Sequence, residues 1–542
     1  MRLARALLGL ALVAGGARAA DFTLDDVSVT AGATTFRAAR VEVSGSPLDR
    51  AAAQALLSSA DARSIGERLA AIKARRIVIP ELAARSEVAG VTQTVVYRDL
   101  ALGEVDAGRA ASMTAAGARF DSRRRGRDVN GACGAMDATG VDFVAIARLM
   151  GEGRGEGEAA PQTKARTFSI ADCAFTSADG VRISIGRSRG RDIGGRPLVA
   201  PVASLIQSGP DGASQPDSPA TQRAVALLAA DLIDSMAFGA IEVDDVRAAG
   251  GEAGKGVDLK IRRVAFTGAR DSRIADITIE GLSADTPDGP ASFDRATLAG
   301  LDVKPVFAAA LAQPARQATP RFDAFEITDL AVRGLGIGRL RVDAGQWYDL
   351  APSLLAATAE RAKIDVAAFG MTALAALGYA SIEARGAFRM RYDVERRTLA
   401  FAEISSEAPG LGRTNFSAEF SKVQPEVFSG DAQALKSALP AIFFSQAALR
   451  LEDLGVFARM AARPDGPSRA QLGQTARLVA RGLLGEGPAG APAVDAIGRF
   501  FESGRSLAMK IEAPQPIGMI DLMMAGRLSG LADRLKIETK TE

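Results

Sequence analysis

The chain of 542 residues contains no histidine and only two cysteines, which excludes much of the usual chemistry of protein sites. Without an imidazole there is no Ser-His-Asp triad, no Cys-His dyad and no histidine-ligated zinc, haem or iron site. Two thiols are too few for a four-thiolate zinc site or an iron–sulfur cluster. We therefore expect no cofactor, no metal and no catalytic residue, so the protein is not expected to be an enzyme.

One segment still matches a catalytic motif. Gly186–Gly190 has the G-x-S-x-G pattern of a nucleophile elbow, with Ser188 at the serine position. That motif needs a sharp turn from a strand into a helix and a histidine base. There is no histidine, and the residues that follow do not begin a helix. We interpret the match as a coincidence in a turn rich in glycine and arginine.

Carboxylate chemistry remains open as an alternative, because two Asp or Glu side chains can hydrolyse a glycosidic bond without histidine. The 64 acidic residues supply many candidate pairs, but sequence position does not show which of them are close in space. One Trp and four Tyr are few for a sugar-binding cleft or a base-stacking surface. A net charge of +2 does not indicate the basic surface that nucleic-acid binding needs, so we expect no nucleic-acid partner.

The N-terminal residues 1–19 have the features of a secretory signal peptide. Basic residues come first, the apolar run Leu7–Ala14 follows, and Ala17-Arg18-Ala19 supplies a small-x-small cleavage site. We expect cleavage between Ala19 and Ala20 and export to the periplasm. An uncleaved N-terminal anchor is the alternative.

Export decides how the two cysteines are interpreted. Cys133 and Cys173 lie 40 residues apart, and an oxidising compartment favours a disulfide between them. Closing a loop of this size stabilises a fold by about 3–4 kcal/mol on the chain-entropy model. A redox pair or a metal site is the alternative, but the chain has no C-x-x-C motif.

The densest cluster of basic residues lies shortly before Cys133 in the sequence. In an exported protein it could contact anionic lipid headgroups, which would place the protein at the membrane periphery. Solvated loop charge is the alternative interpretation. The cluster consists of Arg119, Arg123, Arg124, Arg125 and Arg127.

A short strand pattern recurs six times and organises much of the chain. It reads apolar, any, Asp, apolar, any, apolar or small, as in Leu24–Val29. One step of three between apolar positions replaces a step of two, which predicts a β-bulge or a bend at the Asp. We expect these side chains to accept hydrogen bonds from nearby backbone amides and to be structural. The repeated residues are Asp26, Asp99, Asp172, Asp245, Asp329 and Asp453, the first four 73 residues apart.

Alternating strands and amphipathic segments complete the pattern. A meander is predicted from Ala380 to Val423, with strands that are apolar on one face and charged on the other. Helix-start signals and apolar periodicity predict helices. The predicted helices are Asp49–Ser58, Ala62–Ala74, Ala220–Phe238, Ser353–Arg361, Val366–Leu377, Arg469–Leu484, Val494–Phe501 and Ile517–Leu528, and a last strand is expected at Leu535–Thr539.

We therefore predict a β-dominated α+β fold made of repeated antiparallel strand units with interspersed helices, as an elongated sheet or solenoid-like body. Four segments are expected after residues 1–19. They are a first β-rich region with the helical pair and the disulfide (20–215), a second that opens with a helix (216–350), a helix with the meander (351–460) and an α/β cap (461–542).

The repeated strands, exemplified by Ile274–Leu282, together with the meander around Tyr392 and the turn at Gly410–Gly412, resemble AsmA-like proteins and uncharacterised exported proteins of Gram-negative, especially alphaproteobacterial, origin. The resemblance covers most of residues 22–460 and implies an elongated β-rich periplasmic body that shelters or carries lipid. AsmA-like proteins usually keep a transmembrane anchor, whereas this chain begins with a cleavable-looking signal.

The sequence favours a non-enzymatic envelope protein that binds a lipid or another apolar ligand along a groove of its β-sheet. Two alternatives stay open: a carboxylate-dependent hydrolase, and a structural or adaptor protein whose sheet edges pair with another envelope protein. The pattern gives no oligomeric state.

Overall fold

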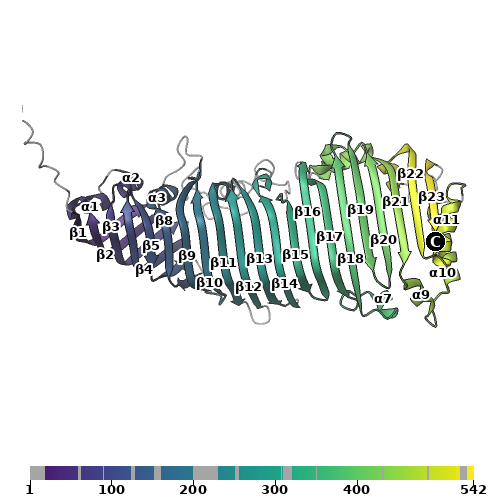
Figure 1. Cartoon of the computed structure of the whole chain (residues 1–542), viewed down its shortest axis with the longest axis horizontal. Helices are drawn as coiled ribbons and strands as arrows, with labels where there is room; N and C mark the ends of the chain where they lie inside the picture. The colour runs from purple at the N-terminus through teal and green to yellow at the C-terminus, as the bar shows by residue number, and fades with distance from the viewer. Residues whose placement is uncertain are drawn as a thin grey trace, which may run out of the picture. The chain divides into compact units, whose positions relative to one another are not determined.

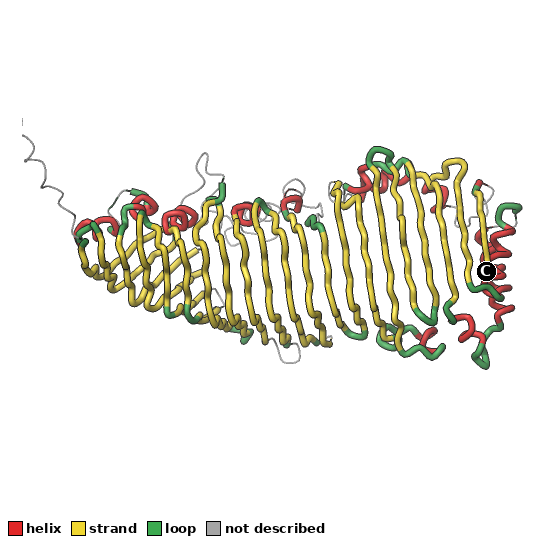
Figure 2. Tube along the Cα trace, viewed as in Figure 1, coloured by secondary structure: helices red, strands yellow, loops and turns green. Residues whose placement is uncertain are grey.

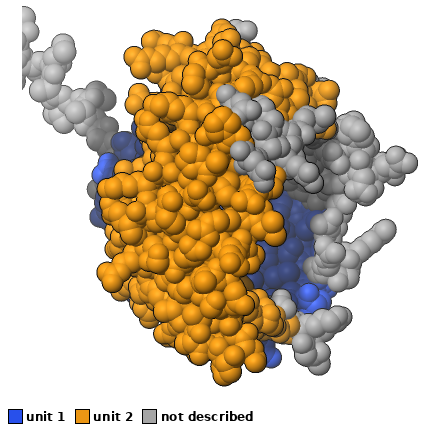
Figure 3. Space-filling model, turned by 90° about the vertical axis from the view of Figure 1, so that its right-hand side faces the viewer, with its two compact units in different colours: residues 1–251, 267–272 blue, residues 252–266, 273–542 orange. Residues whose placement is uncertain are grey.

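The computed structural model describes residues 19–58, 61, 63–88, 91–123, 128–151, 160–198, 230–250, 256–287, 289–306, 308, 320–348, 351–429, 432–484, 487–524 and 534–542 (Figure 1). The chain divides into two compact units, coloured separately in Figure 3. Unit 1 comprises residues 1–251 and 267–272, and unit 2 comprises residues 252–266 and 273–542. The four segments expected from sequence are a finer division and stay a prediction.

Unit 1 is an antiparallel sheet with short helices inserted between strands. Its strands are β1 (Ala20–Ala31), β2 (Thr34–Ser46), β3 (Ala74–Val88), β4 (Val91–Asp106), β5 (Arg109–Ala115), β6 (Gly117–Arg123), β7 (Val129–Cys133), β8 (Met136–Asp142), β9 (Gln162–Ser177), β10 (Arg182–Gly195) and β11 (Met236–Gly250). The labelled helices are α1 (Arg50–Leu57), α2 (Ile65–Ala70) and α3 (Phe143–Gly151), and residues 230–235 are also helical. β4 pairs with β6 through its first half and with β5 through its second, and β7 and β8 pair in the same way with β9.

Unit 2 repeats the antiparallel arrangement. β12 (Val257–Arg270) contributes residues to both units. The other strands are β13 (Arg273–Thr286), β14 (Gly289–Asp302), β15 (Ala324–Val332), β16 (Leu335–Tyr348), β17 (Ala351–Asp365), β18 (Ser381–Asp393), β19 (Thr398–Ala408), β20 (Gly412–Ser421), β21 (Phe443–Asp453), β22 (Ser506–Gly518) and β23 (Lys536–Thr541). From β13 onward each strand pairs with the next along the chain.

The helices of unit 2 lie mainly at strand ends and beside the last two strands (Figure 2). They are α7 (Thr372–Ala376), α8 (Ala432–Ala438), α9 (Val456–Ala461), α10 (Arg469–Leu484), α11 (Ala491–Glu502) and α12 (Met519–Met524), with the 3₁₀ turns Pro425–Phe428 and Leu439–Ala441. Strand therefore dominates in both units, which confirms the β-dominated α+β class with repeated antiparallel strands and interspersed helices.

The repeated Asp marks a bend within a strand, as the spacing predicts. Asp26, Asp99, Asp172, Asp245 and Asp329 have left-handed backbone conformations, with φ of 50°, 51°, 48°, 54° and 50°. Asp enters this region more readily than most residues with a Cβ, which accounts for its recurrence. The predicted hydrogen bonds to backbone amides are wrong at these five positions in the part of the chain described. Asp453 differs, because its Oδ1 accepts from the amides of Gly455 and Phe457.

The bends of alternate strands line up. The pairs Ile185↔Cys173 and Ile185↔Val246 place Gly186 between Asp172 and Asp245. A Cβ at Gly186 would lie 3.0 Å from that of Asp245, so a small residue suits this position. A second row of left-handed residues lies at another level of the sheet. In this row too, the strand beside each left-handed residue has no left-handed residue at the same level. The row consists of Gly45, Glu104, Gly140 and Asp192. The sheet therefore bends along two rows, because successive strands share the same levels.

The bends keep one face of the sheet apolar. In β1 the apolar side chains step from Leu24 to Val27 across Asp26, and in β2 they step from Ala38 to Val41. A strand that kept period two would turn its later apolar residues to the other face. In unit 1 this inner face meets α1 and α3 and forms a core that includes Leu24, Ala53 and Ala110.

Several predicted elements differ from the structure. Ser353–Arg361 is wrong as a helix: it lies within β17, which hydrogen-bonds to a strand on each side, and this pairing outweighs the helical preference of Ala and Leu. Met236–Phe238 belong to β11, so the helix predicted over Ala220–Phe238 ends at Ser235; its residues 220–229 lie outside the described part. Likewise Ile517 lies in β22, and α7 occupies only Thr372–Ala376 of Val366–Leu377.

Other predictions are confirmed. The helical pair is α1 and α2, with Asp49 and Ser64 as their N-caps, although α2 ends at Ala70 and Ala74 already begins β3. Helix α10 has the predicted bounds Arg469–Leu484. The meander is β18, β19 and β20 with a turn at Glu395–Arg397.

Candidate functional site

An apolar cavity lies inside unit 1, between the inner face of β1–β4 and the helices. Its volume is about 260 Å³. No charged or hydrogen-bonding side chain lines it. The lining residues are Val27, Val29, Ala31, Phe36, Ala38, Val41, Leu57, Ile65, Leu69, Ile72, Ile77, Ile79, Leu82, Leu100, Leu102, Val105, Gly108, Phe143, Ile146 and Ala147.

The chain connectivity explains how the cavity forms. Helices α1 and α2 follow β2 and precede β3, so they lie near the end of the strands where the Ser46 hydroxyl donates to the carbonyl of Lys73. Leu57, Ile65 and Leu69 reach the cavity from these helices, whereas Val29 and Phe36 pair near the opposite end, beside the β1–β2 turn. The cavity therefore extends along the strands from the helices toward that turn.

One charged residue is buried next to this apolar wall. Arg68 on α2 is only 7% exposed, and its Nη1 donates to the carbonyl of Ser58 at 2.5 Å. Its Nε has no hydrogen-bond partner among the described residues. Two residues next to this pair in the sequence line the cavity: Leu69, which follows Arg68, and Leu57, which precedes Ser58.

Sequence reasoning predicted the helical pair but missed Arg68. The available signal was the spacing of Ile65, Leu69 and Ile72, which marks one helical face, with Arg68 at the flank of that face. A basic residue there is unusual, because the face packs against the core.

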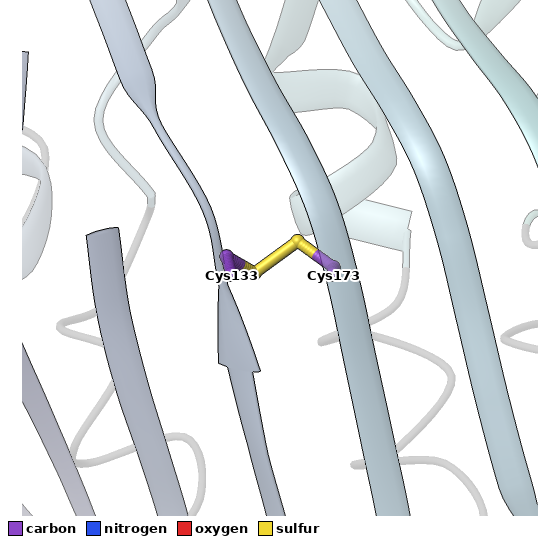
Figure 4. The surroundings of a disulfide bond; sticks show 2 residues. All are labelled: Cys133 and Cys173. Carbon is purple, nitrogen blue, oxygen red and sulfur yellow. A yellow bond between two sulfur atoms is a disulfide. The ribbon is translucent and has the colours of Figure 1, made fainter. Parts of the chain in front are cut away.

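The predicted disulfide is present. Cys133 and Cys173 are bonded and their Cα atoms are 4.0 Å apart, on the neighbouring strands β7 and β9 (Figure 4). They stand directly beside the bend at Asp172, and Cys173 is buried on the inner face. The bond therefore fixes two strands at the level where the sheet bends.

The basic cluster is only partly within the described residues. Arg119 and Arg123 lie on β6 and are exposed, and Arg123 Nε pairs with Asp121 at 2.9 Å. Arg119 alternates with the inner-face residues Ala118 and Phe120, so it faces the outer side of the sheet. Arg124, Arg125 and Arg127 lie outside the described residues. Most of the expected signal peptide, Met1–Arg18, also lies outside them. Ala19 and Ala20 are described, and Ala20 begins β1. Headgroup binding and cleavage stay predictions.

Ser188 lies within β10, paired with Ile170 on one side and Val243 on the other. The expected turn is wrong, because the strand continues through Gly186–Gly190, and the segment does not have the strand-to-helix geometry of a nucleophile elbow.

Several carboxyl groups have a displaced pKa in the part of the chain described, and in each case the pKa is lowered. The Arg63 side chain lowers the pKa of Asp61 to about 2, and Arg339 lowers that of Glu326. Arg413 lowers the pKa of Glu407 in the same way. A general acid at neutral pH needs the opposite shift, so these ion pairs are structural candidates.

The described residues contain no group of three or more acidic or cysteine side chains placed to hold a metal ion. Within them, we find no helix with the length and apolar character needed to cross a membrane.

Comparisons with known proteins give one match. A family model described as an uncharacterized protein matches residues 405–542, which run from β19 to the last residue. No curated protein matches the chain, and no solved structure matches it.

Proposed function

We propose that the protein is a non-enzymatic, exported envelope protein that binds a lipid or another apolar ligand on the inner face of its sheet. The observation that carries this proposal is the cavity of about 260 Å³ whose lining has no hydrogen-bonding side chain. Apolar clefts closed by helices are common ligand sites, and a cavity of this kind excludes polar ligands because it offers them no partner.

The size of the cavity sets the scale of binding. Its volume corresponds to about nine groups the size of a water molecule, roughly one medium-length alkyl chain. Burying each methylene group contributes about 0.8 kcal/mol, so nine contribute about 7 kcal/mol before the cost of association is subtracted. Apolar burial is therefore the main favourable contribution to the binding of a ligand that fills the cavity.

Two further features support the proposal. A disulfide suits a protein of an oxidising compartment, as export would require. The resemblance of the strand repeats to AsmA-like proteins points to lipid rather than to a small aromatic ligand.

The experiment uses N-phenyl-1-naphthylamine, a neutral dye whose fluorescence rises in apolar surroundings. We expect it to bind the purified protein, and we expect Val29→Trp to weaken binding at least tenfold by filling the end of the cavity. Ser28→Trp is the matched control, because Ser28 neighbours Val29 on β1 but is exposed on the other face. Equal binding to wild type and both variants, or no binding to wild type, would contradict the proposal.

A further inference from the structure

The last strand of unit 2 has an open edge within the part of the chain that the structure describes. β23 pairs with β22 on one side, and no described strand lies on its other side (Figure 1). Glu542 exchanges both backbone hydrogen bonds with Ser506, the first residue of β22. Because alternate residues of a strand bond to opposite neighbours, the backbone groups of Ile537, Thr539 and Thr541 point out from the open edge. Such an edge can pair with a further strand.

The outer face of β23 has a regular alternation of charge. Lys536, Glu538, Lys540 and Glu542 are exposed, whereas the residues between them are half-buried. Within one copy the opposite charges pair along the strand, Lys536 with Glu538 at 2.7 Å and Lys540 with Glu542. A strand whose charges alternate in this way can meet an antiparallel copy of itself with opposite charges facing one another.

One antiparallel register satisfies both the backbone and the charges. With Thr539 opposite Thr539 of a second copy, the outward backbone groups face one another and can form about six hydrogen bonds. The same register places Lys540 opposite Glu538 of the second copy, and Lys536 opposite Glu542. A shift by two residues in either direction places like charges opposite one another, Lys536 with Lys540 or Glu538 with Glu542. The charges therefore select a single register.

The helices beside β23 expose apolar side chains. Ile537 packs against a cluster from α10 and α11 that includes Ala480 and Leu484 of α10. On the same helix Leu478 and Val479 are 70% and 58% exposed, the two most exposed large apolar side chains in the described part of the chain. A two-fold axis perpendicular to the joined sheet places the helices of both copies on the same face. Contacts between these helices would add to the strand pair, which alone covers only part of the roughly 1,200–2,000 Å² that a stable interface buries.

We infer that the protein forms a two-fold symmetric dimer in which β23 pairs with β23 of a second copy. The inference does not rest on the proposed function, because the cavity lies in unit 1 and β23 in unit 2. The edge strand of unit 1 does not offer the same contact. The charged residues of β1 are Asp21, Asp25 and Asp26, so two copies of β1 would repel one another. A self-complementary contact closes after two copies, which predicts a dimer and no larger assembly.

The first test is sedimentation velocity of the full-length protein over a wide range of concentration, and we expect an equilibrium between monomer and dimer. Lys540→Glu should weaken the dimer at least tenfold, because the symmetry turns two attractive pairs into two repulsive ones. Glu538→Lys/Lys540→Glu should restore the affinity to within about threefold, since it exchanges the charges of each pair. Lys363→Glu is the matched control, because Lys363 is exposed on β17, a strand paired on both sides.

Thr539→Cys tests the register without a change of charge. In the predicted register Thr539 faces its counterpart with the Cα atoms about 5.5 Å apart, a distance that a disulfide spans. Oxidation should therefore link two copies covalently, seen as a dimer on a non-reducing gel. Thr541→Cys is the matched control, because Thr541 faces Ile537 of the second copy and lies too far from its own counterpart. The native cysteines do not compete, since Cys133 and Cys173 are bonded to each other.

A protein that stays monomeric at every concentration, or a dimer that Lys540→Glu leaves unchanged, overturns the inference. Linkage of Thr541→Cys as efficient as that of Thr539→Cys overturns the register and with it the two-fold pairing. Assemblies that grow beyond the dimer with concentration also overturn it, and would indicate a head-to-tail contact between β23 and the acidic edge of β1. If Lys540→Glu does not fold, the two cysteine variants decide the question.

Discussion

The inner faces of β1–β4 and of β13–β16 have the same strand pattern but different surroundings. In unit 1, helices inserted after β2 and after β8 cover the face, and Leu24 is 2% exposed beneath them. In unit 2, α11 packs on β22 and β23 and α12 packs on β22, while Ile277, Leu298 and Ile337 are half-buried. Val332, the last residue of β15, is 40% exposed.

The comparison separates two properties that a strand pattern does not distinguish. The alternation and the bends specify which face of a strand is apolar. Whether that face becomes a core, a cavity or a half-covered surface depends on the segments between the strands. In unit 2 the other face of β18–β21 carries ion pairs, Arg413 contacting both Glu407 and Glu452 at 2.7 Å. An aromatic row lies on the inner face, and consists of Phe388, Phe401, Phe420 and Phe444 with ring centroids about 6 Å apart.

Reducing the disulfide should give the largest difference between the units. The chain-entropy model assigns about 4 kcal/mol to a loop of this length, and both cysteines lie in unit 1. We expect faster hydrogen exchange in β6–β9 of Cys133→Ala/Cys173→Ala, measured by mass spectrometry. Trp347, the single Trp, lies in β16 and should report unchanged unfolding of unit 2. An equal effect on Trp347 would show that the units unfold together.

A matched pair of leucines tests the covered and half-covered faces. Leu24→Ala should lower the free energy of unfolding of unit 1 by about 3 kcal/mol, because it leaves a hole in a closed core. Leu298→Ala on β14 should cost about 1 kcal/mol, since this side chain already keeps contact with solvent. Urea unfolding with hydrogen exchange of β1–β4 and β13–β15 measures both changes. Similar losses would mean that the inner face of unit 2 is covered as completely as that of unit 1.

The sequence predicted the class, the bends and the disulfide because each depends on local spacing. The step of three around each Asp is visible in six residues, and two cysteines allow one pairing. It led us to expect an apolar groove along the sheet but not its place or its lining, which comes from four strands and three helices that only the tertiary fold brings together. Ser353–Arg361 shows the same limit: its Ala- and Leu-rich composition favours a helix, and pairing with β16 and β18 makes it a strand.

Acid should destabilise unit 2 more than unit 1. Neighbouring arginine and lysine side chains hold the pKa of several of its glutamates below the ordinary value of 4.5, so their stabilising effect is complete above that pH and is lost as the pH falls through the lowered values. In unit 1 the corresponding group is Asp61, whose pKa of about 2 is set chiefly by Arg63. The glutamates are Glu326, Glu407, Glu502, Glu512 and Glu542.

The measurement is the thermal midpoint of unit 2, followed by Trp347 fluorescence at pH 6 and pH 3. We expect the midpoint to fall modestly on acidification, and to fall less in Glu407→Gln, which removes one titrating group. A midpoint that rises at pH 3 would contradict the sign of the effect.

The smallest expected effect concerns the bends, which both units share. Asp99 in β4 and Arg361 in β17 have nearly equal left-handed φ values, 51° and 52°. Arg has no short polar side chain that suits this conformation, so Arg361→Gly should raise the free energy of unfolding of unit 2 by about 0.5–1 kcal/mol. Asp99→Gly should change unit 1 by only a few tenths of a kcal/mol, because Asp tolerates the left-handed region and glycine adds entropy to the unfolded chain. Asp99→Ala is the control, and we expect it to lower the free energy of unfolding of unit 1 by about 1 kcal/mol. Urea unfolding of the three variants then shows whether the backbone conformation or the Asp side chain is responsible for the bend. If Asp99→Gly lost as much as Asp99→Ala, the side chain rather than the φ angle would be the reason that Asp recurs.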